Sequence, residues 1–211
     1  MNTRMKFGLK DKKRIFAVFA AVIIMGFSLS FLIRVNFGAD PCTYMNLGIS
    51  DKLGISFGTW QLLLNAILFI FVILFDRSQI GWGTLANMVL LGYTVDFFRW
   101  CFDFIIPSHT FSSLIVRIVV LVPSLILFIL AAAVYMSVEL GSVPYDATVF
   151  IIASKLKRIP FRVIRMTWDI SACIIGLLLG GAIGIVTVIM AFSLGSVISW
   201  VKSKVNRFFT V

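Results

Sequence analysis

Long apolar runs separated by short polar loops dominate the chain. The runs lie at residues 14–37, 57–76, 80–106, 113–138, 161–181 and 183–201. An α-helix needs about 20 predominantly apolar residues to cross the hydrocarbon core of a bilayer. Since each run is close to that length, the pattern predicts six transmembrane helices.

Two shorter segments, 41–53 and 144–156, are more polar than the runs around them. Asp40-Pro41 is a strong helix start, with Asp as the N-cap and Pro at the first helical position. In 41–53 an apolar stripe lies opposite a polar one: Cys42, Met45, Ile49 and Leu53 against Thr43, Asn46, Ser50 and Asp51. The spacing predicts an amphipathic helix of about 20 Å, which lies shallowly at the membrane surface or continues outward after a break at Gly38.

The second half of the chain repeats the first at a constant offset of 103 residues. The recurring positions are Arg14-Ile15 and Arg117-Ile118, Gly38 and Gly141, Pro41 and Pro144, Lys52-Leu53 and Lys155-Leu156, Ile80-Gly81 and Ile183-Gly184, Thr84 and Thr187, and Leu91-Gly92 and Leu194-Gly195. Several are Gly, Pro or Thr, which set backbone geometry. Duplicated apolar units are typical of many transporter folds, although duplication also produces membrane proteins that transport nothing.

The number of crossings per repeat decides how the two copies are oriented. If the short helices do not cross, each repeat has three spans, and an odd number inverts the second copy. If both cross, the repeats are parallel and the chain has eight spans. We predict an all-α membrane protein of six transmembrane helices, arranged as two inverted three-helix repeats (14–106 and 113–201), each with one extra short helix. The eight-span arrangement stays open.

Composition and charge support a membrane location. The chain is 60% hydrophobic and 13% charged, with a mean hydropathy of +1.05, and no soluble domain of this size could cover so much apolar surface. The net charge of +10 is concentrated in segments 1–13, 155–165 and 202–211. Because loops rich in Lys and Arg stay cytoplasmic, we expect both termini in the cytoplasm and a lipid bilayer, not nucleic acid, as the partner.

Signatures of enzymes and metal sites are missing. Cys42, Cys101 and Cys173 are scattered without CxxC spacing, and His109 is the only histidine. Neither a disulfide framework nor a metal site is therefore predicted. The chain has no HExxH or P-loop motif. We expect no catalytic residue, no metal and no cofactor.

Polar groups at membrane depth are costly and therefore functional candidates. In the third run, Asp96 and Arg99 are three residues apart and can form an ion pair. They end a stripe of small and polar residues: Gly81, Thr84, Met88, Gly92, Asp96 and Arg99. Asp169 is the acidic residue deepest in a run. The alternatives are that the stripe serves helix packing and that Asp169 is a structural carboxylate partnered by Arg117 or Arg34.

The junctions 34–41 and 139–146 each combine a break, a helix N-terminus and polar side chains. Helix N-termini favour anions, and broken helices in matching positions often mark transporter sites. Alternatively, Asp40 and Ser142 simply cap their own helices. The complete set of candidate substrate-binding residues is Asn36, Asp40, Thr43, Thr84, Asp96, Arg99, Glu139, Tyr145, Asp146 and Asp169.

Several short motifs resemble a known group of bacterial membrane proteins. They are Leu47-Gly48-Ile49-Ser50, Gly54-Ile55-Ser56-Phe57-Gly58-Thr59, Asn65, Ile80-Gly81-Trp82-Gly83-Thr84 and Leu91-Gly92. Together they resemble the YczE/YyaS/YitT group over nearly the whole chain. The resemblance implies a multi-pass protein of the bacterial inner membrane, and it supplies neither a substrate nor catalytic residues.

Two functions fit these observations. The first is a small secondary transporter or permease for a small polar or anionic solute, with its site where the two breaks, the 84–96 stripe and Asp169 converge at the repeat interface. The second is a non-transporting accessory, regulatory or substrate-capture membrane subunit. Assembly as a homo-oligomer or with another membrane protein stays open.

Overall fold

The structure is a computed structural model that describes residues 9–181 and 183–209. All its regular elements in these residues are helical, which confirms the predicted all-α class. The longer helices are α1 (Leu9–Val35), α2 (Pro41–Leu53), α3 (Phe57–Phe75), α5 (Gly92–Ile105), α6 (Leu114–Ser137), α7 (Pro144–Lys155), α8 (Phe161–Leu178) and α9 (Ile185–Phe209). The short elements are η1 (Arg77–Gln79), α4 (Trp82–Ala86), the π-helical η2 (Asn87–Leu91) and η3 (Ser108–Ser112).

Within the described residues, three helices are long and apolar enough to cross a membrane: α1, α3 and α6. The other three predicted spans are also helical, but each departs from a plain apolar span or from its predicted limits. The run 80–106 is divided into α4, η2 and α5, α8 carries charged residues, and α9 begins at Ile185 and continues to Phe209. The protein therefore has the helices that six spans need, while the number of crossings stays a prediction.

The short helix α2 has the predicted bounds but not the predicted surroundings. Thr43, Asn46 and Ser50 on its polar side are at most 4% exposed, whereas Leu53 on its apolar side is 55% exposed. The helix packs against α8 and α3. The polar side of α2 therefore faces the protein interior, as polar side chains of membrane proteins do, and the position of this helix relative to the membrane surface stays a prediction.

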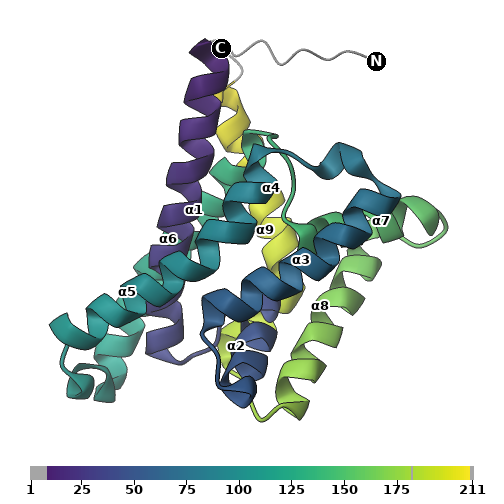
Figure 1. The fold of residues 1–211 in the computed structure, drawn as a ribbon. Coiled ribbons are helices and arrows are strands. Elements are labelled where there is room, and N and C mark those ends of the chain that lie inside the picture. The colour runs from purple at the N-terminus through teal and green to yellow at the C-terminus, as the bar shows by residue number, and fades with distance from the viewer. Residues whose placement is uncertain (1–8, 182, 210–211) are drawn as a thin grey trace.

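The pair α1 and α6 forms the centre of the fold, and the two helices run antiparallel (Figure 1). Arg14 near the start of α1 donates to the carbonyl of Val138, which directly follows α6. Arg117 near the start of α6 donates to the carbonyl of Val35 at the end of α1, at 2.7 Å. Arg117 lies 103 positions after Arg14, and Val138 lies 103 positions after Val35. The two contacts are therefore equivalent.

The breaks after α1 and α6 have the same backbone geometry. Asn36 and Glu139 have φ angles of 55° and 54°, and Gly38 and Gly141 have φ angles of 103° and 106°. Positive φ is uncommon for a residue with a side chain, and glycine adopts it readily. The repeated Asn/Glu and Gly positions therefore encode a specific change of chain direction, used once in each half.

Each break is held by the opposite half of the chain. The N–H of Gly83 in α4 donates to the carbonyl of Leu140 in the second break, at 2.7 Å. The N–H of Val186 in α9 donates to the carbonyl of Phe37 in the first break, at 3.0 Å. These residues are again related by the offset of 103. We call this pair of contacts the reciprocal junction.

The loop after α3 also connects to the second break. Ser142 donates from its N–H to the carbonyl of Gln79, at 2.9 Å, and from its hydroxyl to Gln79 Oε1, at 3.0 Å. The idea that Ser142 caps its own helix is therefore wrong.

In the loop after α3, hydrogen bonds from Ser78 lower the pKa of the Asp76 carboxyl. The ionised carboxylate accepts these hydrogen bonds within the turn.

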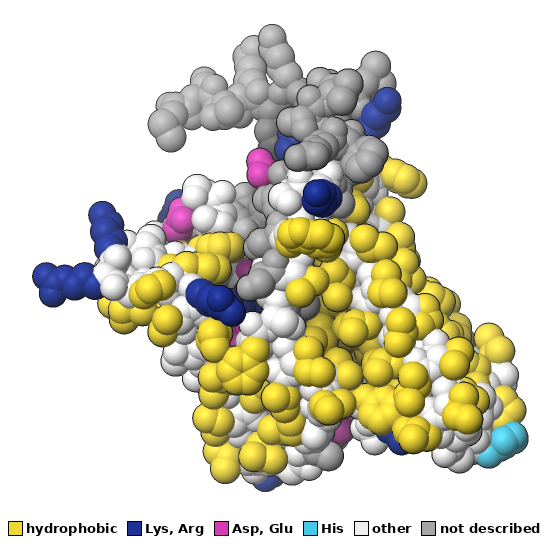
Figure 2. Space-filling view, turned by 180° about the vertical axis from the view of Figure 1, so that it is seen from behind, with side chains coloured by type: hydrophobic (Ala, Val, Ile, Leu, Met, Phe, Trp, Pro, Cys, Tyr) yellow, Lys and Arg dark blue, Asp and Glu magenta, His cyan; other side chains and the backbone are white. Residues whose placement is uncertain are grey.

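The outer faces of the helices are strongly apolar. Figure 2 shows a broad hydrophobic area, with Lys and Arg gathered toward its upper and left margins. Exposed residues include Ile67, Ile70 and Leu74 of α3, Ile115, Val119 and Val122 of α6, and Val188, Ile189 and Phe192 of α9. Soluble monomers rarely expose apolar areas of this extent, so the surface suits contact with lipid.

A single methyl group at the reciprocal junction should weaken the fold. A Cβ at Gly81 would overlap the carbonyl oxygen of Leu140, and one at Gly184 would overlap that of Phe37. Because overpacking typically costs about 1–3 kcal/mol, Gly81→Ala and Gly184→Ala should each lower the Tm of the protein in nanodiscs. Gly195→Ala is the control, since its Cβ would meet nothing within 4 Å. An unchanged Tm in both junction variants would contradict the close packing.

Candidate functional site

A cavity of about 100 Å³ lies between the middle parts of α1 and α6 and the starts of α2 and α7. We call it the central cavity. Ten of its lining residues form five pairs at the offset of 103: Met25 and Phe128, Leu29 and Ala132, Asp40 and Val143, Cys42 and Tyr145, and Thr43 and Asp146. The central cavity is therefore placed where equivalent parts of the two repeats face each other.

Three side chains that line the central cavity have polar atoms without a hydrogen-bond partner. These atoms are Gln61 Oε1, both amide atoms of Asn87 and the hydroxyl of Tyr135. The three residues are 5%, 0% and 4% exposed, respectively. A buried polar group without a partner costs about 1–3 kcal/mol, and folded proteins contain few of them. Their concentration at one cavity indicates a site for a polar molecule.

Asn87 reaches the cavity from an irregular part of the third predicted span. The α-helical α4 ends at Ala86, and the π-helical η2 begins at Asn87. A π-helical turn is rare and is frequently found at functional sites, where it redirects side chains. The irregularity thus coincides with the one residue of this segment whose amide is buried and unsatisfied at both atoms.

An ion-pair cluster borders the central cavity on the side of the second repeat. Arg165 donates to Asp146 Oδ1 and, from Nε, to Asp169 Oδ2 at 2.9 Å. The Tyr145 hydroxyl donates to the other oxygen of Asp169, at 3.0 Å. Arg165, Tyr145 and Asp146 line the cavity, while Asp169 lies behind them and is 2% exposed. Asp169 is therefore a partnered carboxylate that also orients two residues of the cavity wall.

Neither arginine suggested as the partner of Asp169 is the one that binds it. Arg34 pairs with Asp103 at 2.6 Å, and Arg117 donates to backbone carbonyls after α1. Arg165, four residues before Asp169, is the partner instead, a spacing that brings side chains together on one helix face. The sequence pattern assigns Arg165 to the basic cytoplasmic cluster, and its spacing of four residues to Asp169 was the available signal of its role.

Asp40 contributes a further carboxylate to the central cavity. Its Oδ1 accepts from the N–H of Thr43 at 3.1 Å, which confirms the predicted N-cap of α2. Among the described residues, no Lys or Arg lies within ion-pair distance of Asp40. Arg165 therefore pairs with two of the three carboxyl groups in and behind the cavity wall, and Asp40 has no ion-pair partner among the described residues.

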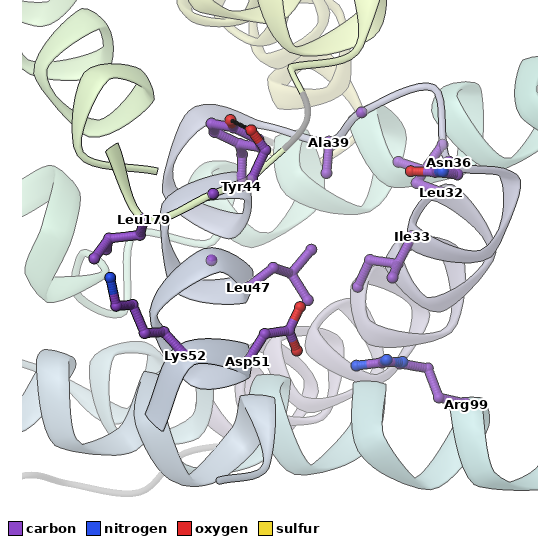
Figure 3. Close-up of a pocket in the computed structure, with 14 residues that line it drawn as sticks. Leu32, Ile33, Asn36, Ala39, Tyr44, Leu47, Asp51, Lys52, Arg99 and Leu179 are labelled. Atoms are coloured by element: carbon purple, nitrogen blue, oxygen red, sulfur yellow. Dashed lines mark hydrogen bonds between the residues drawn. The ribbon is translucent and has the colours of Figure 1, made fainter. Parts of the chain in front are cut away.

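Two wider pockets lie toward opposite ends of the α1 and α6 pair. The first-break pocket, about 250 Å³, is lined by Asn36, Asp51, Lys52 and Arg99 among others, and Figure 3 shows the Asp51 and Arg99 side chains pointing toward each other. The second-break pocket has a volume of about 340 Å³. Six lining residues of the first-break pocket have equivalents in the second-break pocket at the offset of 103. The pairs are Leu32 and Tyr135, Ile33 and Met136, Asn36 and Glu139, Gly38 and Gly141, Ala39 and Ser142, and Leu47 and Phe150.

The two pockets differ in how they relate to the central cavity. The second-break pocket shares Tyr135, Met136, Val143 and Asp146 with the cavity wall. Among the described lining residues, the first-break pocket shares none with it. The cavity is therefore adjacent to one of the two equivalent pockets and separated from the other.

The predicted site residues fall into several places instead of one. Asp40, Thr43, Tyr145 and Asp146 line the central cavity, and Asp169 is bonded to its wall. The remaining candidates at the breaks separate: Asn36 and Arg99 line the first-break pocket, and Glu139 lines the second-break pocket. The expectation of one shared polar cavity therefore holds for half of the set.

Thr84 and Asp96 have structural roles. The Thr84 hydroxyl donates to the carbonyl of Gln79 at 3.1 Å and accepts from the N–H of Gly81. Asp96 accepts from the N–H of Gly58 at 2.8 Å, at the start of α3, and does not form the suggested ion pair with Arg99 among the described residues. The small-residue stripe serves helix packing, because a Cβ at Gly92 would lie 2.7 Å from the Cα of Gly58.

The sequence interpretation did not select Gln61, Asn65, Asn87, Tyr135 and Arg165 as site residues, although all line the central cavity. Gln61 and Asn65 are four residues apart within an otherwise apolar span, so both lie on one helix face. Isolated polar residues of this kind in α3 and η2 were the available signal. Tyr135 carried no comparable signal, because aromatic residues are common in apolar spans.

Removing the only cation of the cluster should destabilise the protein. Arg165→Met leaves the Asp146 and Asp169 carboxylates without their counter-charge, and breaking a buried pair typically costs about 3–5 kcal/mol. The Tm in nanodiscs should therefore fall strongly. Arg162→Met, one helical turn earlier and exposed, is the matched control and should have little effect. Equal effects of both substitutions would show that the ion pairs contribute nothing beyond surface charge.

Comparisons with known proteins agree with the resemblance seen in the motifs. The chain is 26% identical over 200 residues to an uncharacterised protein of Haemophilus influenzae, with 92% of this chain and 86% of the relative covered. It is 28% identical over 181 residues to the uncharacterised membrane protein YczE of Bacillus subtilis, with 85% and 81% covered. It is 25% identical over 138 residues to the uncharacterised protein YyaS of Bacillus subtilis, with 65% and 67% covered. No solved structure matches the chain.

The resemblance to YczE and YyaS is therefore confirmed. Together with the apolar helices, it shows a membrane protein. The match to the family of unknown function DUF6198 extends over residues 12–203, nearly the whole chain, and the protein belongs to that family.

Proposed function

We propose that the protein is a small secondary transporter or permease of the bacterial cytoplasmic membrane, which moves a small polar solute through the central cavity. The observation that carries this proposal is the set of buried, unpartnered polar atoms of Gln61, Asn87 and Tyr135 around one cavity between the repeats. Polar groups retained at such cost in a membrane protein generally serve a solute pathway. In this proposal the partners are the bilayer and the solute, and no catalytic group or cofactor has a role.

The direction of the central helices supports an inverted topology. Since α1 and α6 are equivalent helices and run antiparallel, they cross a membrane in opposite directions if both cross it. A parallel eight-span arrangement would instead require equivalent helices to run the same way. With the basic segment 1–13 in the cytoplasm, α1 ends at the outer side and the C-terminal tail returns to the cytoplasm.

The two break pockets support alternating access. In transporters built from inverted repeats, one site near the bilayer midplane is reached from each side in turn, as equivalent parts of the repeats exchange positions. Here the pockets are equivalent, and the central cavity adjoins only the second-break pocket among the described lining residues. In the proposed orientation that pocket faces the cytoplasm, and we infer that the shared lining represents a state nearer to inward access.

The orientation of the two repeats can be measured by cysteine labelling. We expect Lys52→Cys to react with a membrane-impermeant maleimide from outside intact cells and Lys155→Cys to react only from the cytoplasmic side. The background is a variant in which Cys42, Cys101 and Cys173 are replaced. Labelling of both positions from the same side would refute the inverted topology and favour the parallel one.

A substitution of Asn87 can distinguish a transport role of this residue from a structural role. Asn87→Leu removes two unsatisfied buried atoms, so it should maintain or raise the Tm while it abolishes solute uptake by proteoliposomes. Asn46→Leu is the control for stability. Asn46 is equally buried, but its amide oxygen accepts from Trp60 Nε1 at 3.1 Å, so the same substitution should lower the Tm.

The uptake assay also distinguishes the alternative function. Uptake of a small polar solute by wild-type proteoliposomes, and its loss in Asn87→Leu, would support the transporter. Solute binding that depends on Asn87 without any uptake would favour a substrate-capture subunit. Wild-type uptake that Asn87→Leu leaves unchanged would contradict the assignment of the central cavity.

A further inference from the structure

The unpartnered atoms at the central cavity include both acceptors and donors, and the carboxylates of the lining add further acceptors. Gln61 Oε1 and Asn87 Oδ1 can only accept, and Asn87 Nδ2 can only donate, while the Tyr135 hydroxyl can do either. The carboxylates of Asp40 and Asp146 also line the cavity, and an ionised carboxylate is an acceptor alone. A molecule that satisfies this wall must donate several hydrogen bonds.

The charges around the cavity point to the same kind of molecule. Arg165 is already bonded to Asp146 and Asp169. Among the described residues, no Lys or Arg forms an ion pair with Asp40. A carboxylate removed from water is strongly disfavoured unless a positive charge compensates it. The sequence-based option of an anionic solute is therefore the less suitable one, because the described cation in the lining, Arg165, is already bonded to two carboxyl groups.

The lining favours an organic cation over a metal ion. Among the described residues, no group of three or more His, Cys, Asp or Glu side chains is arranged to hold a metal ion. Amide oxygens, a hydroxyl and a carboxylate around a small space match the N–H donors of an ammonium or guanidinium group. The volume of about 100 Å³ has room for such a group with a short alkyl chain, which Met25, Leu29 and Phe128 can contact.

We propose that the central cavity binds a small organic cation that carries an ammonium or guanidinium group. Asp40 provides the counter-charge, and Gln61 and Asn87 accept hydrogen bonds from the nitrogen. The Arg165 cluster holds Asp146 and Asp169 through ion pairs and is not itself the anchor. The inference rests on the proposed function, since it names the class of solute that would be moved.

The test measures the Tm of the full-length protein in nanodiscs against increasing concentrations of defined probes. Ethylammonium and methylguanidinium carry charge and N–H donors. Tetramethylammonium carries charge without N–H donors, methylurea is a neutral counterpart, acetate is an anion, and sodium chloride controls for ionic strength. A ligand that binds the folded state raises the Tm in a saturable way, and we expect this for ethylammonium, methylguanidinium or both.

Two substitutions locate the effect in the cavity. Asp40→Asn removes the charge but keeps the helix cap, because Asn caps as well as Asp, and it should weaken the apparent affinity about tenfold or more. Gln61→Leu has no capping role and should weaken it as well. Asp103→Asn is the matched control, since this carboxylate lies at the end of α5 with its side chain 70% exposed, and it should respond like the wild type.

The possible results separate the cation site from transport. A Tm rise with the N–H cations that Asp40→Asn weakens and Asp103→Asn retains would support the proposal. A similar rise with sodium or tetramethylammonium, a rise with methylurea or acetate alone, or no rise with either N–H cation would overturn it. If the cations bind as proposed but do not enter proteoliposomes, the cation site stands and the transporter function fails.

Discussion

The reciprocal junction is the contact on which the other features of the fold depend. The start of α4 is bonded to the second break and the start of α9 to the first, through backbone groups 103 positions apart in both cases. Backbone-to-backbone contact at this distance leaves no room for a side chain at Gly81 or Gly184. Since each half closes the break of the other, neither break has its full set of hydrogen bonds until both repeats are in place. The starts of α2 and α7, and with them the central cavity, follow from that closure.

The central cavity illustrates how a membrane protein places its polar groups. The outer surface is apolar because its solvent is lipid, so the polar positions of α2, α3 and η2 face inward. Most of these groups are satisfied there, as Asn46 is by Trp60. Asn87 and Gln61 are not, and a fold selected for stability alone would have replaced them by apolar residues. This contrast between satisfied and unsatisfied buried amides distinguishes the candidate site from the rest of the interior.

The sequence predicted the limits of α2, α3, α6 and α7 well, because apolar runs, the Asp40-Pro41 cap and the glycines at the breaks are local signals. It did not predict which face of α2 is buried, because amphipathicity shows two faces and not which of them meets the protein. The role of Arg165 was missed since a basic residue near a loop is interpreted as a topology signal, and only its partners Asp146 and Asp169 show otherwise. Asp96 was selected for its depth in an apolar run, yet it binds the start of α3. Such tertiary partners have no local signature.

The duplicated backbone encloses a cavity in which several polar lining residues have no polar or charged equivalent in the other repeat. Gln61, Asn65 and Asn87 come from the first repeat, and their equivalents in the second are Ile164, Trp168 and Met190. Arg165 comes from the second repeat, and its equivalent in the first is Leu62. The backbone of the two repeats is therefore alike, whereas the amides of the lining come from the first repeat and the guanidinium comes from the second. A solute held there would keep one polarity relative to the protein, whichever side it came from.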